Sequence, residues 1–383
     1  MSQSAKTRKR RRSVSSRGGR SSEDRRPGSC RTFEFDAGME KRALLIVGVF
    51  ITLFAVTSCR ELKVKHKHLQ LAPYNHTAAR IVVQYASAVY LSDLTELFTW
   101  TCSRCDGFIE DFEIVELIVD VKRCLQAFVG VAADLNATVI AFRGTQETSL
   151  QNWVEDLFWK QLDTSYPGVE DAKVHHGFYS AYHNTTLRPG VISAIRKVKA
   201  FYGDIKVIVT GHSMGGAMAS FCGLDLRLSL GEQNVQVMTF GQPRIGNAAF
   251  ASYYNQVVPD TIRVTNGHDV VPHLPPYYHY FPQKTYHHFP REVWLYSNDG
   301  SMVEKVCDGS GEDPTCSRSV SGRSISDHLT YYGVHMGCDS PSGCKIVTDP
   351  RLAAYRRTDD DGNVVFSRDP SKSILKLNAD QGD

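Results

Sequence analysis

The pentapeptide Gly211–His212–Ser213–Met214–Gly215 has the pattern G-x-S-x-G, which suits a nucleophilic serine. A serine can attack covalently when a sharp turn between a strand and a helix exposes its hydroxyl group. The flanking glycines leave room for such a turn because they carry no Cβ atom. At the start of the helix, free N–H groups and the helix dipole favour developing negative charge. We therefore predict that Ser213 is a catalytic nucleophile.

A serine at neutral pH becomes nucleophilic when a histidine takes its proton and a carboxylate holds that histidine in the right tautomer. Asp269 suits the carboxylate role because it shortly follows the apolar, β-branched segment 261–265, and catalytic acids lie at the carboxyl ends of strands in open sheets. Asp225 falls inside the helix expected after the serine. Asp327 adjoins a histidine in sequence, so the two side chains would diverge. We predict that Asp269 is the acid.

The chain has 14 histidines, and His328 fits the base role because it follows both Ser213 and Asp269. The order serine, acid, histidine is the one found around a G-x-S-x-G elbow. A lone histidine is more often a packing or surface residue. Spacing also leaves open four histidines in a loop rich in proline and tyrosine: His273, His279, His287 and His288.

The negative oxygen of a tetrahedral intermediate needs backbone N–H donors near the nucleophile. Met214 follows Ser213 directly, and Thr145 lies just beyond the apolar segment 137–142. We predict that the N–H groups of Met214 and Thr145 form an oxyanion hole, with the Thr145 hydroxyl as a further donor. The alternative is that Arg143–Gly144–Thr145 is only a turn.

Residues 148–159 have the spacing of an amphipathic helix that begins three residues after Thr145. Apolar residues recur at i, i+3, i+4, i+7 and i+8, and polar residues take the other face. Most such helices pack on a core, but this one is close enough to cover the serine. We predict a lid with the apolar face Leu150, Trp153, Val154, Leu157 and Phe158.

These candidate residues lie among alternating strands and helices, which is typical of an α/β fold with a mostly parallel central sheet flanked by helices. Apolar and β-branched runs predict strands at 112–121, 125–132, 137–142, 205–209, 235–240 and 261–266. Helical spacing predicts helices at 78–89, 178–201 with an interruption near Pro189, and 215–230.

The first 42 residues differ from the rest of the chain in charge. They hold 13 lysines and arginines against five acidic residues, a local charge of +8, whereas the whole chain carries +3 and the remainder therefore −5. The basic residues belong to a segment expected to be disordered and not to the catalytic body, which argues against a nucleic-acid enzyme.

The apolar segment 43–59 is short for a membrane span and suits the core of a signal peptide. A start at Met39 gives an ordinary signal peptide, whereas a start at Met1 favours an uncleaved anchor and a single-pass membrane protein with a cytoplasmic N-terminus. Either way the body is expected to be secreted or lumenal, and N-x-T sequons at Asn75, Asn136 and Asn184 agree. The expected organisation is a basic segment 1–42, a signal segment 43–59, an α/β domain 60–345 and a polar C-terminal tail 346–383.

The ten cysteines favour an oxidising compartment. A redox or zinc site at Cys102-x-x-Cys105 lacks a matching second pair. Close pairs that a disulfide would join are Cys102 with Cys105, Cys307 with Cys316 and, less distinctly, Cys338 with Cys344. Cys124 and Cys222 lie in apolar segments and are expected to be buried thiols.

Beyond the serine motif, the chain resembles the fungal-type, or class 3, lipase family. The matching segments occur in family order over roughly residues 80–340: Phe142–Thr145, Asn152–Trp153, Val174–Phe178, Gly211–Gly215, Gly241–Asn247, Asp269–Pro276 and Asp327–Gly333. The resemblance implies an α/β-hydrolase fold with Ser213, Asp269 and His328 as the triad. It also implies that the 150–158 helix is the family's lid.

Two positions depart from the family pattern. Met214 stands where the family usually has leucine, but the oxyanion hole needs only its backbone N–H. The family often joins the N-terminal part of the body to its C-terminus by a disulfide. Leu91 takes the place of the first cysteine of that bond, which leaves Cys344 as the obvious partner of Cys338.

The sequence thus predicts a serine hydrolase that cleaves lipid esters such as acylglycerols through an acyl-enzyme, without a cofactor or metal. Alternatives are a soluble carboxylesterase of the feruloyl-esterase type, a phospholipase, and an inactive lipase-like binding protein. The expected partner is lipid ester at a lipid–water interface, contacted by the lid and, if uncleaved, by residues 43–59. No nucleic-acid partner is expected, and the protein is expected to be a monomer.

Overall fold

The structure is a computed structural model that describes residues 73–159, 162–278, 285–339, 347 and 349–373. All of these belong to one unit, His66–Asp383. Its main sheet consists of β1 (Phe112–Asp120), β2 (Leu125–Ala132), β3 (Ala137–Phe142), β6 (Lys206–His212), β7 (Val235–Phe240), β8 (Thr261–Asn266), β9 (Glu292–Asn298), β10 (Ser301–Val306), β13 (Arg356–Thr358) and β14 (Val364–Ser367). Two small sheets pair β4 (Thr164–Ser165) with β5 (Lys173–Val174) and β11 (Thr330–Tyr331) with β12 (Val334–His335).

The ten strands of the main sheet lie in the order β10-β9-β8-β7-β6-β3-β2-β1-β14-β13. The five strands β9, β8, β7, β6 and β3 run parallel, and antiparallel strands extend both edges. Parallel strands need crossover helices, and the sequence supplies a helix between β6 and β7 and between β7 and β8. The predicted α/β-hydrolase fold, with a parallel centre and flanking helices, is confirmed.

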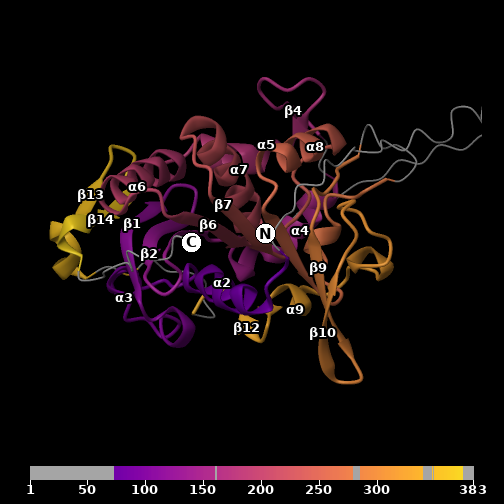
Figure 1. Ribbon diagram of the computed structural model, residues 1–383, viewed down its shortest axis with the longest axis horizontal. Helices are drawn as coiled ribbons and strands as arrows, with labels where there is room; N and C mark the ends of the chain where they lie inside the picture. Colours follow the sequence, from indigo (N-terminus) through magenta and orange to yellow (C-terminus); the bar gives the residue numbers. More distant parts are fainter. Residues whose placement is uncertain (1–72, 160–161, 279–284, 340–346, 348, 374–383) are drawn as a thin grey trace, which may run out of the picture. The chain divides into compact units, whose positions relative to one another are not determined.

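Helices cover both faces of the sheet (Figure 1). One face carries α2 (His76–Ala88) and α3 (Leu94–Thr99), and the other carries α5 (His176–His183), α6 (Leu187–Tyr202), α7 (Met214–Ser229) and α8 (Ala248–Val257). The remaining helices are α4 (Glu147–Trp159) and α9 (Ile325–His328), with the short 3₁₀ turns η1 (Gly107–Ile109), η2 (Val271–His273), η3 (Ser317–Ser319), η4 (Pro350–Ala354) and η5 (Pro370–Lys372).

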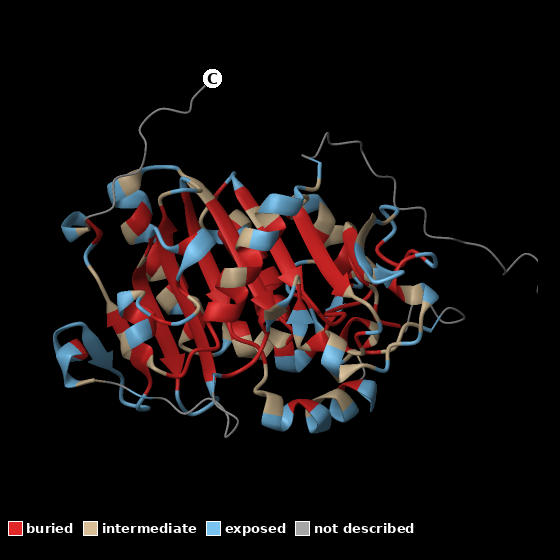
Figure 2. Cartoon of the chain, turned by 90° about the horizontal axis from the view of Figure 1, so that it is seen from below, coloured by how far each residue is buried: buried red, intermediate tan, exposed pale blue. Residues whose placement is uncertain are grey.

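The central strands of the main sheet are buried on both faces, as Figure 2 shows by their red colour between partly exposed helices. Alternate residues of β6 pack into the hydrophobic cores on opposite faces of the sheet. Ile208 packs with α2, whereas Val207 and Val209 pack with α7 on the opposite side. A strand that is buried on both faces must be apolar at successive positions, which is why β6 is a continuous apolar run.

Two expectations about local structure differ from the fold, and a third is confirmed. The helical segment breaks at residues 184–186 and not at Pro189. Pro189 lies in the first turn of α6, where a backbone N–H has no partner within the helix, so the missing N–H of proline costs no hydrogen bond. Cys124 is exposed in the β1–β2 turn at a φ of 54°, because the strand ends before it. Cys222 is buried in α7 as predicted.

The segment expected to be a polar tail, 346–383, contributes to the main sheet. Its strands β13 and β14 extend the sheet beyond β1, and Val364 and Phe366 are buried. Pairing with β14 satisfies the outer edge of β1, which would otherwise leave its N–H and C=O groups open.

Disulfides join Cys102 with Cys105 and Cys307 with Cys316, as predicted. Cys338 is also disulfide-bonded, and its predicted partner Cys344 lies outside the described residues. Among the residues that the structure describes, no helix is long and apolar enough to cross a membrane. The apolar segment 43–59 lies outside the described part.

Candidate active site

Ser213 lies in a sharp turn between β6 and α7 and is 1% exposed. Its φ of 59° is unusual for a residue with a Cβ atom, and such strain costs about 1–3 kcal/mol. The turn is held by the Ser213 N–H, which donates to Phe240 O over 2.9 Å, and by the Gly216 N–H, which donates to Ser213 O over 3.0 Å. The structure thus has the strand–turn–helix context that the sequence predicts for a nucleophile.

The two glycines of the motif are required by close contacts. A Cβ on Gly211 would lie 2.4 Å from the backbone of Gly215, and a Cβ on Gly215 would lie 2.2 Å from Phe142 O. Real Cβ atoms do not approach backbone that closely, so the start of α7 can sit against β3 and β6 only with glycine at both positions.

Asp269 and His328 are joined by a buried hydrogen bond of 2.9 Å between Asp269 Oδ2 and His328 Nδ1. Asp269 follows the carboxyl end of β8, and His328 ends α9. The second oxygen of Asp269 accepts the Val271 N–H over 2.8 Å, and Tyr331 donates its hydroxyl to Oδ2 over 2.5 Å. These bonds fix the carboxylate and turn the imidazole toward it.

A proton on Nδ1 of His328, facing the carboxylate, leaves the lone pair on Nε2. His328 Nε2 and Ser213 Oγ are each buried and lack a hydrogen-bond partner within the described part of the chain. The ring of His212, the residue before Ser213, lies 4.3 Å from the ring of His328, so His328 packs against the elbow. Ser213 Oγ can therefore donate its proton, and His328 Nε2 can accept one, as proton transfer requires.

The competing carboxylates have other partners. Asp225 accepts bonds from Arg188 over 2.8 Å and from Tyr182 over 3.0 Å. Asp327 accepts the His268 N–H over 2.7 Å. Neither bonds to His328, which agrees with the choice of Asp269 as the candidate acid.

The competing histidines bond to backbone carbonyl groups. His273 contacts Asp269 O over 2.9 Å, His287 contacts His288 O over 2.6 Å, and His288 contacts Pro272 O over 2.9 Å. His279 lies outside the described residues. Burial lowers the pKa of His287 and, more strongly, that of His288, so these rings favour the neutral form. They hold the loop after Asp269 in place.

The candidate oxyanion loop lies against the nucleophile. A Cβ on Gly144 would lie 3.1 Å from Ser213 Cβ and 2.5 Å from His212 O. Thr145 follows, and its hydroxyl contacts Met214 Sδ over 3.9 Å. Arg143–Gly144–Thr145 is thus the segment beside the elbow, which is where backbone donors for an oxyanion are needed.

A buried hydrogen-bond chain joins the oxyanion loop to the base. The Gly144 N–H donates to the Tyr90 hydroxyl over 3.1 Å, Tyr90 contacts His212 Nδ1 over 2.9 Å, and His212 Nε2 contacts His328 O over 2.8 Å. A carbonyl only accepts, so His212 carries its proton on Nε2 and Nδ1 accepts from Tyr90. Burial lowers the pKa of His212 well below its ordinary value, which keeps this tautomer uncharged.

Helix α4, the predicted lid, packs against the body of the protein. Leu150 and Leu157 are each 2% exposed, and Trp153 and Val154 pack partly buried against the core that contains α5 and α7. Phe158 differs from the prediction, because it is 48% exposed. At about 100° per residue it lies about 80° from Leu150, at the margin of the stripe. Its neighbour Trp159 is 80% exposed.

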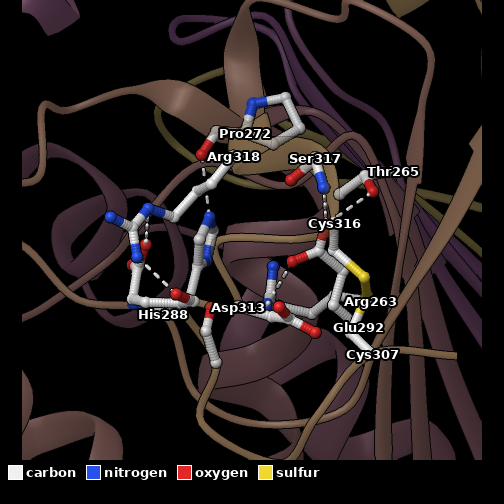
Figure 3. Close-up of polar contacts among 12 residues, drawn as sticks. Arg263, Thr265, Pro272, His288, Glu292, Cys307, Asp313, Cys316, Ser317 and Arg318 are labelled. Atoms are coloured by element: carbon white, nitrogen blue, oxygen red, sulfur yellow. Dashed lines mark hydrogen bonds and ion pairs between the residues drawn. A yellow bond between two sulfur atoms is a disulfide. The ribbon is translucent and has the colours of Figure 1, made fainter. Parts of the chain in front are cut away.

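A buried polar network joins β8, β9 and the segment at Ser317 (Figure 3). Glu292 on β9 accepts bonds from Thr265 over 2.9 Å and from the Ser317 N–H over 3.2 Å, beside Arg263. The Cys307–Cys316 disulfide precedes Ser317 directly, so it fixes that segment. Cys307, Asp313 and Cys316 have metal-ligand spacing, but the disulfide occupies both sulfur atoms.

Comparison with known proteins agrees with this geometry. The family model described as lipase (class 3) matches residues 139–279. A lipase of Rhizomucor miehei is 35% identical over 243 residues, which cover 62% of this chain and 63% of the relative. The match thus spans less than two thirds of that relative's length. Lipase ZK262.3 of Caenorhabditis elegans is 30% identical, with 71% of this chain and 83% of the relative covered.

A solved triacylglycerol lipase structure, whose catalytic centre is described as a serine protease triad, matches with a TM-score of 0.60 and 32% identity. It covers 69% of this chain and 96% of that one. The chain belongs to the class 3 lipase family.

Proposed function

We propose that this chain is a serine hydrolase that cleaves carboxylic esters of lipids, with acylglycerols as the substrate class. The observation that carries the proposal is the buried pair Asp269–His328, with an imidazole Nε2 left free beside the serine elbow. Family membership supports the lipid substrate, since the solved relative is a triacylglycerol lipase.

In the proposed reaction, Ser213 Oγ attacks the ester carbonyl carbon while His328 Nε2 takes the hydroxyl proton. The N–H groups of Thr145 and Met214 stabilise the oxyanion of the tetrahedral intermediate. His328 then gives the proton to the departing alcohol oxygen, and the acyl group remains on Ser213. Water, deprotonated by His328, releases the fatty acid by the reverse sequence.

Helix α4 is the proposed lid. Ser213 and His328 are both buried, so a covering segment must move before an ester can reach them, and α4 is the segment that would move. Displacement would expose Leu150 and Leu157 to water, and full burial of each is worth about 1.5–3 kcal/mol. A lipid surface accepts these side chains instead, so lipid binds the open state preferentially and raises its population.

We further propose that the body is made in the secretory pathway and acts as a secreted or lumenal enzyme. The two disulfides favour an oxidising compartment. Residues 43–59 would supply the signal, and the catalytic domain would extend past the expected boundary at 345 to include β13 and β14.

The test is hydrolysis of an ester series of increasing chain length, measured below and above the solubility limit of each ester with wild type and Ser213→Ala. We expect a rate jump at the solubility limit in wild type and loss of activity in the variant. Equal rates on either side of the limit would favour a soluble carboxylesterase, and no hydrolysis by wild type would favour a binding protein.

A further inference from the structure

The acidic side chain that opens the lid helix is docked on the body of the protein. Glu147 is the first residue of α4, and its Oε1 atom is buried. His335 Nε2 lies 2.8 Å from this oxygen. A Cβ on Gly337 would lie 1.3 Å from it, so the carboxylate rests directly on the backbone of that glycine.

Arg104 completes the surroundings of this carboxylate. Its guanidinium donates to Gly337 O over 2.8 Å and to Ser87 O over 3.1 Å. Burial lowers the pKa of Arg104, and the negative charges of Asp339 and Glu147 oppose this shift. We call His335, Gly337 and Arg104 together the Glu147 seat.

The seat is joined to neighbouring parts of the molecule by covalent and hydrogen bonds. Arg104 lies within the loop closed by the Cys102–Cys105 disulfide. Ser87 of α2 donates its hydroxyl to His335 O over 2.7 Å, and β12 pairs with β11, which follows His328 closely. Glu147 therefore connects the lid to the segment that carries the candidate base.

Lid opening must disturb this contact. Residues three and seven positions apart lie on one face of a helix, so Glu147 heads the same stripe as Leu150 and Val154. Leu150, one turn away, is buried in the core. A movement that lifts Leu150 out of the core must also lift the Glu147 carboxylate off Gly337.

We propose that Glu147 is a positioning residue that holds the lid closed through its seat. The inference rests on the proposed function, because a closed lid matters only if it covers a catalytic serine. The contact exists in the closed arrangement and is broken on opening. It therefore sets the fraction of molecules that are open in the absence of lipid.

Three variants remove the seat in different ways. Glu147→Gln removes the charge, His335→Gln removes the neighbouring imidazole, and Gly337→Ala displaces the carboxylate, whose flexible end can swing away. Only Glu147→Gln changes a residue of α4. An effect shared by all three variants therefore cannot come from the loss of a negative charge that stabilises the helix dipole at the start of α4. Glu155→Gln is the matched control, because Glu155 is an exposed acid on the same helix.

The experiment measures how fast a soluble phosphonate labels Ser213 in the full chain, with and without phosphatidylcholine vesicles. Without vesicles, each seat variant should be labelled about threefold faster than wild type, which corresponds to about 0.7 kcal/mol. Vesicles should abolish the difference, and Glu155→Gln should match wild type. The double variant Glu147→Gln/Gly337→Ala should be labelled no faster than either single variant, because both changes remove the same contact.

Wild-type labelling rates in all three seat variants, each folded by circular dichroism, would overturn the inference while leaving the proposed function intact. If wild type is not labelled at Ser213 even with vesicles, the proposed function fails and the inference fails with it.

Discussion

The Tyr331 hydroxyl donates to Asp269 Oδ2 over 2.5 Å, and both side chains are buried. The same oxygen accepts the N–H of His328. Burial, with the added effect of the Asp269 charge, raises the pKa of Tyr331 well above its ordinary value, so the hydroxyl keeps its proton and donates. Tyr331 therefore helps to hold the carboxylate that orients the candidate base.

Replacement of Tyr331 by phenylalanine should lower kcat about tenfold with little change in KM, because a hydrogen bond to a charged group is worth about 1.5–3 kcal/mol and only part of it acts through His328. Steady-state hydrolysis of a soluble short-chain ester measures both constants. Tyr332→Phe is the control, since that hydroxyl contacts Tyr74 and not Asp269. Equal kcat values in the two variants would contradict a role for Tyr331 in holding the Asp269 carboxylate.

Replacement of Tyr90 by phenylalanine should lower kcat by about one to two orders of magnitude with little change in KM, because the oxyanion loop loses its link to His212. The variant leaves the Gly144 N–H and His212 Nδ1 without this buried partner. Tyr182→Phe removes another buried hydroxyl, bonded to Asp225, and should reduce stability alone. A similar kcat loss in both variants would indicate general destabilisation.

Serine substitutions at Leu157 and Trp159 should act in opposite ways. Leu157 belongs to the proposed lid and is buried, so Leu157→Ser should favour opening and raise the rate on soluble ester by roughly tenfold. Trp159 is exposed, so Trp159→Ser should leave that rate unchanged and lower the rate on emulsified ester by about threefold. Parallel assays on both substrates check this, and identical behaviour of the two variants would contradict the lid assignment.

Stability should fall as the pH drops below about 6.5, the ordinary histidine pKa. Burial, reinforced by the charges of Arg263 and Arg244, lowers the pKa of His288 in the folded protein. Below about pH 6.5 the unfolded chain therefore binds a proton at His288 that the folded chain does not bind. His288→Gln keeps an N–H donor and should reduce the slope of unfolding free energy between pH 6 and 5 by roughly 1 kcal/mol per pH unit. Urea titrations at several pH values measure the slope, and an unchanged slope would refute this role.

The central strands and the helix after the elbow can be predicted from sequence because a strand buried on both faces is apolar at most of its positions. The strands β13 and β14 cannot be recognised in this way. They are short, and only Val364 and Phe366 alternate toward the core. Their position depends on the free edge of β1, which is more than 200 residues away in sequence.

The candidate triad is predictable because the elbow pattern and chain order point to Ser213, Asp269 and His328. The residues that support it are not. Tyr90 and His212 are 122 residues apart, and a tyrosine or a histidine alone gives no sign of its partner. Phe158 has the residue type of a core position but lies at the end of the stripe, where packing and not periodicity decides exposure.

The central claim is that Ser213 is the nucleophile and His328 its base, and peptide mapping after reaction with a fluorophosphonate tests it directly. One adduct is expected, on Ser213, formed faster with lipid vesicles and lost in Ser213→Ala. His328→Ala should fold and bind vesicles but react at least a hundredfold more slowly, because the hydroxyl keeps its proton. An adduct on another serine, or full ester hydrolysis by Ser213→Ala, would contradict the account.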